Sequence, residues 1–203
     1  MSTCKLPSPA CDGMKRAEIT ELLDSELIRL RLTRKNAYSY WAHEVWLDRY
    51  TDHEKRVDFV EFLPKGGVTY SDGPHIEHGT FSFYEVKSCM SDLKSGHGLN
   101  FMGDENWLVM PVEMFEPYKE ETVVKDPHGY VAQRTRPARC LLYGIGRNGK
   151  PTFWEQPKAW ENKNRCRERS ASELLFAMMR AMIANSDHSS VDHRVRRIGE
   201  EAE

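Results

Sequence analysis

Apolar residues that recur every three or four positions predict two long helices in this chain. The first runs from Lys15 to about Leu32, and its apolar stripe consists of Ile19, Leu22, Leu23, Leu27 and Leu30. The second follows Ser170, which forms a capping box with Glu173, and its apolar face consists of Leu174, Leu175, Met178, Met179 and Met182.

Shorter alternating or compact apolar stretches predict a sheet. The expected strands are Ala42–Asp48, Arg56–Leu63, Thr80–Ser88, Asn106–Pro111, Gly129–Ala132, Cys140–Ile145 and Thr152–Trp154. Short helices are expected over Met90–Lys94 and Val112–Glu120, and a loop over Ser71–Gly79. Because helices and strands alternate, we expect an α/β fold with a central mixed β-sheet and helices on both of its sides.

The chain length of 203 residues fits one domain with appendages. We expect a single α/β domain over residues 15–184, with a core over about 15–120 and an extension over 121–184. Residues 1–14 predict a flexible leader, and residues 185–203 predict a polar tail. No apolar run approaches the roughly 18 residues that span a bilayer, and a signal peptide's apolar stretch is missing, so no membrane partner is expected.

The five cysteines form no CxxC pair, which predicts free thiols in a reducing cytoplasm. The charge balance excludes a general polyelectrolyte binder, because 29 Lys and Arg against 31 Asp and Glu give a net charge of −2. The segment Arg134–Arg169 carries ten basic and three acidic residues, or +7, so the rest of the chain carries −9. Interleaved aromatic residues suit phosphate contacts and base stacking there. Taken alone, this mixture is more typical of a solvated face over core aromatics.

Two of the expected strands carry charged residues on apolar faces. Alternation places Asp58 on the apolar face of the first strand, and Glu85 and Lys87 on the apolar face of the second. Burying three charges is costly unless something binds them. A divalent cation would remove that cost, because Asp58 and Glu85 would supply the oxygen ligands that Mg²⁺ prefers.

The neighbouring residues complete a set of groups for phosphate chemistry. The carbonyl of Val86 would supply a further ligand, and waters and a phosphate oxygen would fill the octahedron. Lys87 would orient or help deprotonate the attacking water and offset charge on the phosphorane. The spacing therefore fits hydrolysis of a phosphodiester.

This pattern resembles the PD-(D/E)XK nuclease superfamily, with Asp58 followed 27 residues later by Glu85-Val86-Lys87. The stretch EVKSCMSDLKSGHGLNFMGDENWLVMP (Glu85–Pro111) is similar to the MmcB-like branch and to proteins of phages and prophages. There an E-[VI]-K strand leads into S-x-x-D-[FL], a basic residue and a W-L-V-M-P strand. The likeness is specific over Val57–Pro111, and Val57 stands where many relatives have proline.

The resemblance implies a restriction-endonuclease-like core and a Mg²⁺ (or Mn²⁺) cofactor. It implies that Asp58 and Glu85 bind the metal and that Lys87 is the catalytic lysine. Superfamily members often add a glutamate from the first helix, and Glu26 is the candidate because it lies near the middle of the apolar stripe. Glu44, on the strand before Asp58, is the competing third carboxylate.

The candidate substrate-binding residues follow the catalytic strand or lie in the basic segment: Lys94, His97, Asn100, Arg134, Arg136 and Arg139. Phosphate contact and plain loop solvation are equally open for the first three.

Together these features predict a metal-dependent nuclease that hydrolyses DNA, encoded by a phage or prophage and linked to DNA repair, recombination or replication. We expect it in the cytoplasm of a bacterial or phage-infected host cell, and homodimer formation stays open. The alternative is a catalytically silent DNA-binding or replication-associated protein that retains the fold. RNA or a nucleotide as substrate is a third hypothesis, and single-stranded, branched and duplex DNA all stay open.

Overall fold

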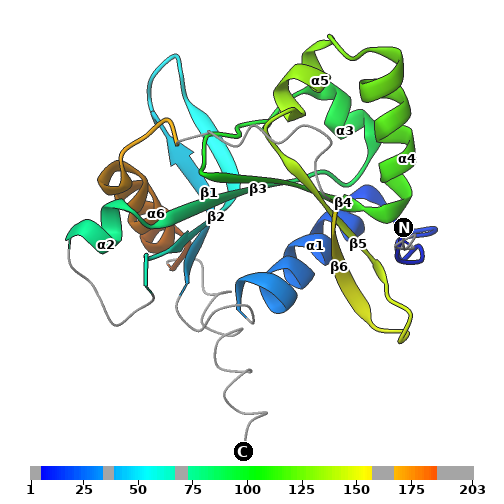
Figure 1. Ribbon diagram of the computed structural model, residues 1–203, viewed down its shortest axis with the longest axis horizontal. Coiled ribbons are helices and arrows are strands. Elements are labelled where there is room, and N and C mark those ends of the chain that lie inside the picture. Colours follow the sequence, from blue (N-terminus) through cyan, green and yellow to red (C-terminus); the bar gives the residue numbers. More distant parts are fainter. Residues whose placement is uncertain (1–5, 34–38, 67–72, 157–166, 187–203) are drawn as a thin grey trace, which may run out of the picture.

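The computed structural model describes residues 6–33, 39–66, 73–156 and 167–186. Its strands form one six-stranded mixed sheet whose spatial order follows the chain (Figure 1). They are β1 (Tyr40–Leu47), β2 (Lys55–Leu63), β3 (Thr80–Val86), β4 (Glu105–Pro111), β5 (Arg139–Ile145) and β6 (Pro151–Gln156). The first three strands pair antiparallel, β3, β4 and β5 pair parallel, and β6 returns antiparallel to β5.

Six α-helices connect or cover these strands in the part of the chain that the structure describes. They are α1 (Arg16–Leu27), α2 (Gly73–Glu77), α3 (Met90–Ser95), α4 (Phe115–Tyr118), α5 (Tyr130–Thr135) and α6 (Ala171–Ser186). A π-helical turn extends α1 over Ile28–Leu32, and α4 lies between a 3₁₀ turn at Val112–Met114 and a π-helical turn at Lys119–Lys125. Among the described residues, none of these helices has the length and apolarity that crossing a membrane requires.

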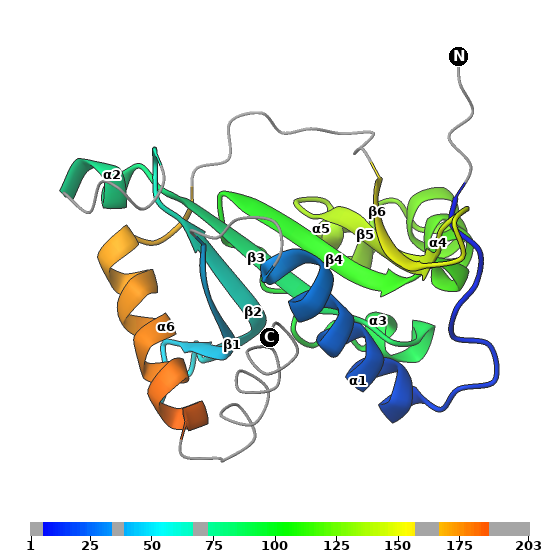
Figure 2. The ribbon, with the colours of Figure 1, turned by 90° about the horizontal axis from the view of Figure 1, so that it is seen from below.

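Helices cover both faces of the sheet, as Figure 2 shows for α1 and α6. On one face, α1 packs on the central strands through Leu23, Leu27, Tyr84, Trp107 and Leu141. On the opposite face, α6 packs on the antiparallel strands through Leu174, Met178, Val60, Phe62 and Phe83. A third cluster on that face joins α3 and α4 to β4 and β5 through Leu93, Phe115, Leu108, Met110 and Leu142. The expected α/β fold with a mixed sheet between helices is confirmed.

Most of the predicted elements form within a few residues of their expected bounds, but two predictions are wrong. The predicted strand Gly129–Ala132 is instead the start of α5, where the amide of Gln133 donates to the carbonyl of Gly129 (3.0 Å). Only Tyr130 and Val131 in this stretch have strand propensity, and they do not outweigh the helix that the following residues continue. The predicted loop Ser71–Gly79 contains the short helix α2 in its described part.

The described part of the expected leader, residues 6–14, is attached to the domain. Ser8 forms a two-way backbone bridge with Ile145 (2.8 Å each way). The amides of Ala10 and Cys11 both donate to Oε1 of Glu113 (2.8 Å). The expectation of a flexible leader is therefore wrong for these residues, because their backbone groups have partners in the sheet and in the turn before α4.

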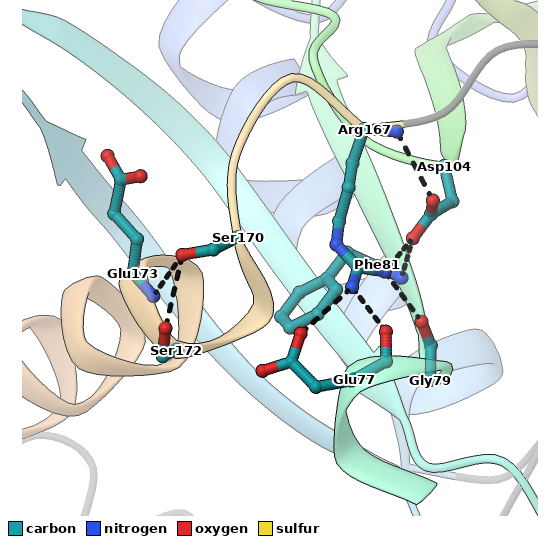
Figure 3. Close-up of polar contacts among 8 residues, drawn as sticks. All are labelled: Glu77, Gly79, Phe81, Asp104, Arg167, Ser170, Ser172 and Glu173. Atoms are coloured by element: carbon teal, nitrogen blue, oxygen red, sulfur yellow. Dashed lines mark hydrogen bonds and ion pairs between the residues drawn. The ribbon is translucent and has the colours of Figure 1, made fainter. Parts of the chain in front are cut away.

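The last helix presents a different face to the sheet than its apolar pattern predicts. Its buried residues include Ala177 and Ala181, whereas Met179 and Met182 are 57% and 51% exposed. The small alanines let α6 approach β1 closely, so its contact face is rotated away from these two methionines. Half of the predicted capping box forms, because Ser170 accepts a hydrogen bond from the amide of Glu173 (3.2 Å; Figure 3).

Candidate functional site

The strands β2 and β3 stop pairing at Asp58. Their last ladder pair is Phe59 with Tyr84. One residue further, Oδ2 of Asp58 accepts a hydrogen bond from the backbone amide of Val86 (2.8 Å). A side-chain carboxylate thus takes the place of a main-chain acceptor, and the two strands separate beyond it.

The alternation of side chains between the two faces of the sheet fails on β2 and on its other neighbour, β1, near Asp58. Val57 and Val60 belong to one core cluster, as do Ala42 and Val45 on the neighbouring strand. Between the second pair, Glu44 has a left-handed backbone (φ 51°), which turns the following side chains to the other face. At this break Asp58 directs its carboxylate toward the amide of Val86 on β3, and its expected place on the apolar face of β2 stays a prediction.

Glu85 is completely buried, with an exposed fraction of 0%. Neither of its carboxylate oxygens has a hydrogen-bond partner among the described residues. Burial, and then the negative charge of Asp58, raise the pKa of Glu85 well above its ordinary value, while Lys87 opposes the shift. A buried carboxylate whose oxygens accept no hydrogen bond is costly, so Glu85 is a candidate to bind a cation.

Lys87 lies immediately beyond β3 and is 5% exposed. Its amide continues the ladder by donating to the carbonyl of Val109 (2.9 Å). Its Nζ donates to the carbonyl of His97 (2.8 Å), which fixes the ammonium group beside the loop that follows α3. The predicted pair Glu85 and Lys87 is thus held on one side of the sheet under that loop.

The loop over residues 96–100 covers these two side chains. Gly96 and Gly98 have left-handed backbones (φ 69° and 73°). A Cβ atom at Gly98 would lie 3.0 Å from Oε2 of Glu85 and 3.3 Å from Nζ of Lys87. Glycine is therefore required at this position for conformation and for space alike.

A cleft of about 920 Å³ opens beside this loop. Asp58, Val86 and Lys87 line it, together with residues of the β1–β2 hairpin and of α5. Several charged side chains that line the cleft form ion pairs with one another: Arg16 with Asp92 (2.9 Å), Arg56 with Glu44 (3.4 Å), and Arg169 with Asp48.

The two candidates for a third carboxylate lie in different places. Glu26 accepts a hydrogen bond from Nε of its helix neighbour Arg29 (3.0 Å) and is outside the set of residues that line the cleft. Glu44 lines the cleft and occupies the register position opposite Asp58. Asp24 of α1 also lines the cleft and was missed, because the apolar stripe singled out Glu26 instead.

The arrangement offers two carboxylates for a metal. Among the described residues, no group of three or more His, Cys, Asp or Glu side chains is close enough to hold an ion. Mg²⁺ is often held by one or two carboxylates together with waters and substrate phosphates. Asp58, the unpartnered Glu85 and the carbonyl of Val86 therefore fit such an ion by the chemistry of their donors.

The predicted substrate-binding residues divide into two groups. His97, Asn100 and Arg134 line the cleft. Lys94, Arg136 and Arg139 do not belong to the residues that line the cleft, and Lys94 forms an ion pair with Glu121 instead. Tyr130, which also lines the cleft, was missed because its segment was predicted to be a strand.

The basic segment contributes less free charge than its composition suggests. Arg167 donates to the carbonyl of Gly79 (3.1 Å) and to Oδ2 of Asp104 (3.3 Å), and its guanidinium lies 5.4 Å from the ring centroid of Phe81 (Figure 3). Arg169 pairs with Asp48 and Glu173. Residues 157–166 of the segment lie outside the described residues.

Cys11, Cys89 and Cys140 lie in the part of the chain that the structure describes, and none of these three forms a disulfide there. Comparisons with family models, with curated proteins and with solved structures find no match to this chain, so they assign it to no family.

Proposed function

We propose that this protein is a metal-dependent nuclease that hydrolyses phosphodiester bonds in DNA. The observation that carries the proposal is the joint position of Asp58, Glu85 and Lys87 where β2 and β3 separate, with both oxygens of Glu85 buried and unpartnered. Such a carboxylate is stabilised by a bound cation, and the adjacent lysine supplies the group that phosphate hydrolysis needs.

Each residue has a distinct role in this proposal. Asp58 and Glu85 would hold Mg²⁺ or Mn²⁺, together with the carbonyl of Val86. The ion, when bound, would polarise the phosphate and lower the pKa of a coordinated water. Lys87, already held by the carbonyl of His97, would orient the attacking water and stabilise negative charge on the phosphorane.

The order of elements supports a restriction-endonuclease-like core for this site. A helix precedes three antiparallel strands, and a short helix then leads to β4, which is parallel to β3. Asp58 lies on the second strand of that unit and Glu85 on the third, and Lys87 follows directly after the third strand. A phage or prophage origin, a role in DNA repair, recombination or replication, and a cytoplasmic location belong to the same proposal and rest on the sequence resemblance.

The test is cleavage of labelled plasmid, single-stranded DNA, branched DNA and RNA with Mg²⁺, with Mn²⁺ and with EDTA. Lys87→Ala and Glu85→Gln are expected to abolish cleavage, since they remove the proposed lysine and metal ligand. Lys94→Ala is the matched control, because Lys94 pairs with Glu121 outside the cleft lining. Cleavage that persists in EDTA or in Lys87→Ala would contradict the proposal.

The second candidate is a catalytically silent DNA-binding protein. The full burial of Glu85 beneath the Gly98 loop favours it, as does the two-carboxylate limit of the metal-ligand set among the described residues. Salt-dependent DNA binding without cleavage under any metal condition would support this candidate over the nuclease.

A further inference from the structure

Tyr130 presents an aromatic ring to the proposed catalytic cleft. It is the first residue of α5, it lines the cleft, and it is 60% exposed. Arg134 follows one helical turn later on the same side of α5 and also lines the cleft, with its guanidinium 5.6 Å from the ring centroid. The two side chains form one unit, an exposed aromatic ring with a guanidinium over it.

This unit lies close to the residues proposed for catalysis. The ring is packed on Gly96, where a Cβ atom would be only 2.4 Å from its Cε1. Two residues further, a Cβ atom at Gly98 would lie 3.0 Å from Oε2 of Glu85 and 3.3 Å from Nζ of Lys87. Two Cα–Cα steps span at most about 7.6 Å, so the glycine beside the ring and the glycine beside the proposed catalytic residues are close neighbours on one loop.

Arg134 differs from the other arginines that line the cleft. Arg16, Arg56 and Arg169 are each paired with a carboxylate. Within the described ranges, Arg134 forms no ion pair, and its guanidinium contacts the ring of Tyr130. Its charge is therefore available to a phosphate beside the ring.

We propose that Tyr130 and Arg134 form a stacking subsite that selects nucleic acid with an unpaired base next to the scissile phosphate; this rests on the proposed nuclease function. Bases inside a duplex are stacked on both faces, so an exposed ring can accept only a base that has left the stack. Single strands, frayed ends and branch points present such bases. Among the described residues, seven acidic side chains and six lysine or arginine side chains line the cleft, so phosphate attraction alone is a weak source of affinity.

The direct test measures binding without cleavage. In a Lys87→Ala background, a single-stranded oligonucleotide that contains 2-aminopurine is titrated with the full chain, and the matching duplex is titrated in parallel. Adding Tyr130→Leu is expected to weaken single-strand binding by at least about fivefold and to remove the quenching of 2-aminopurine, because leucine keeps the apolar contact but not the stacking. Tyr130→Phe is expected to retain both, and duplex binding is expected to stay unchanged.

Tyr50 provides the matched control. It is 83% exposed, with the guanidinium of Arg49 5.1 Å from its ring, but it is outside the lining of the cleft. Tyr50→Leu is therefore expected to leave single-strand binding unchanged.

Three outcomes would overturn the inference. Tyr130→Leu could leave the affinity for single strands unchanged, it could weaken the affinity for single strand and duplex equally, or neither DNA could bind measurably. Equal weakening of single-strand and duplex binding would mean that the ring only supports the loop at Gly96. In the active chain, Tyr130→Leu is expected to raise KM for single strands and to leave kcat unchanged. Absence of cleavage by every chain would refute the nuclease proposal alone, since the binding titration is independent of it.

Discussion

The carboxylate of Asp58 accepts a hydrogen bond from the amide of Val86 at the point where β2 and β3 separate (2.8 Å). This contact holds the proposed metal-binding carboxylate beside the strand that carries Glu85 and Lys87. It also gives Asp58 a structural role that is separable from its proposed role in catalysis.

Two substitutions separate those roles. Asp58→Asn keeps an oxygen that can accept from Val86, so the free energy of unfolding should change little, whereas metal-dependent cleavage should be lost. Asp58→Ala leaves that amide without its acceptor and should destabilise the protein by about 1–3 kcal/mol. Urea denaturation and a cleavage assay on both variants measure the two effects. Equal destabilisation by both substitutions would argue against the hydrogen bond.

Gly98 should be intolerant of a side chain. Its left-handed backbone and its closeness to Glu85 and Lys87 predict that Gly98→Ala disturbs these two proposed catalytic groups. Gly149→Ala is the matched control, since Gly149 has a similar φ of 71° with nothing within 4 Å of its Cβ position. The control should cost only the backbone strain of about 1–2 kcal/mol. Gly98→Ala should cost more and reduce cleavage; equal unfolding free energies for the two variants would contradict this prediction.

Glu85 should make the metal-free protein less stable as pH rises. Its pKa in the folded chain is raised well above its ordinary value of 4.5, so the folded state holds a proton that the unfolded state has released. Stability from this group is complete below pH 4.5 and is lost as pH rises through the folded pKa.

Thermal melts in EDTA across pH 5–8 check this prediction. The difference in Tm between Glu85→Gln and the wild-type chain should grow with pH, because the glutamine stays neutral. Mg²⁺ should reduce that difference by stabilising the ionised carboxylate. A difference that is constant across the pH range would contradict the raised pKa.

Arg167 should act in folding rather than in DNA binding. It joins the segment before α6 to Asp104 and to the carbonyl of Gly79, so Arg167→Ala should lower the free energy of unfolding by about 2–3 kcal/mol. Arg147→Ala, at an exposed position in the β5–β6 turn, should leave the free energy of unfolding unchanged. Denaturant titrations measure both, and a fluorescence titration with DNA at fixed salt should give similar affinity for Arg167→Ala and the wild-type chain.

The sequence pattern was sufficient for most of the sheet and for the placement of Glu85 and Lys87. Apolar periodicity reports burial directly, which is why α1, β2, β3 and β4 were predicted within a few residues. The same signal misplaced the contact face of α6, because the buried Ala177 and Ala181 are less apolar than the exposed Met179 and Met182. Helix contact there depends on how closely two backbones approach, and periodicity does not report that distance.

Long-range contacts explain what the sequence could not predict at the site. The carboxylate of Asp58 is held by the amide of Val86 on the neighbouring strand. Glu85 is covered by the loop over residues 96–100, whose conformation depends on two glycines. Tyr130 reaches the cleft only because its segment is helical. None of these relationships has a signature in local spacing.

The central claim is that Asp58 and Glu85 together hold a divalent cation. Titration of the full chain with Mn²⁺, followed by electron paramagnetic resonance, tests it most directly, with Glu26→Gln as the control outside the cleft lining. The wild-type chain and the control should bind Mn²⁺ alike, and Asp58→Asn and Glu85→Gln should each lose that binding. Equal Mn²⁺ binding by the wild-type chain and Glu85→Gln, or no binding by the wild-type chain, would contradict the claim.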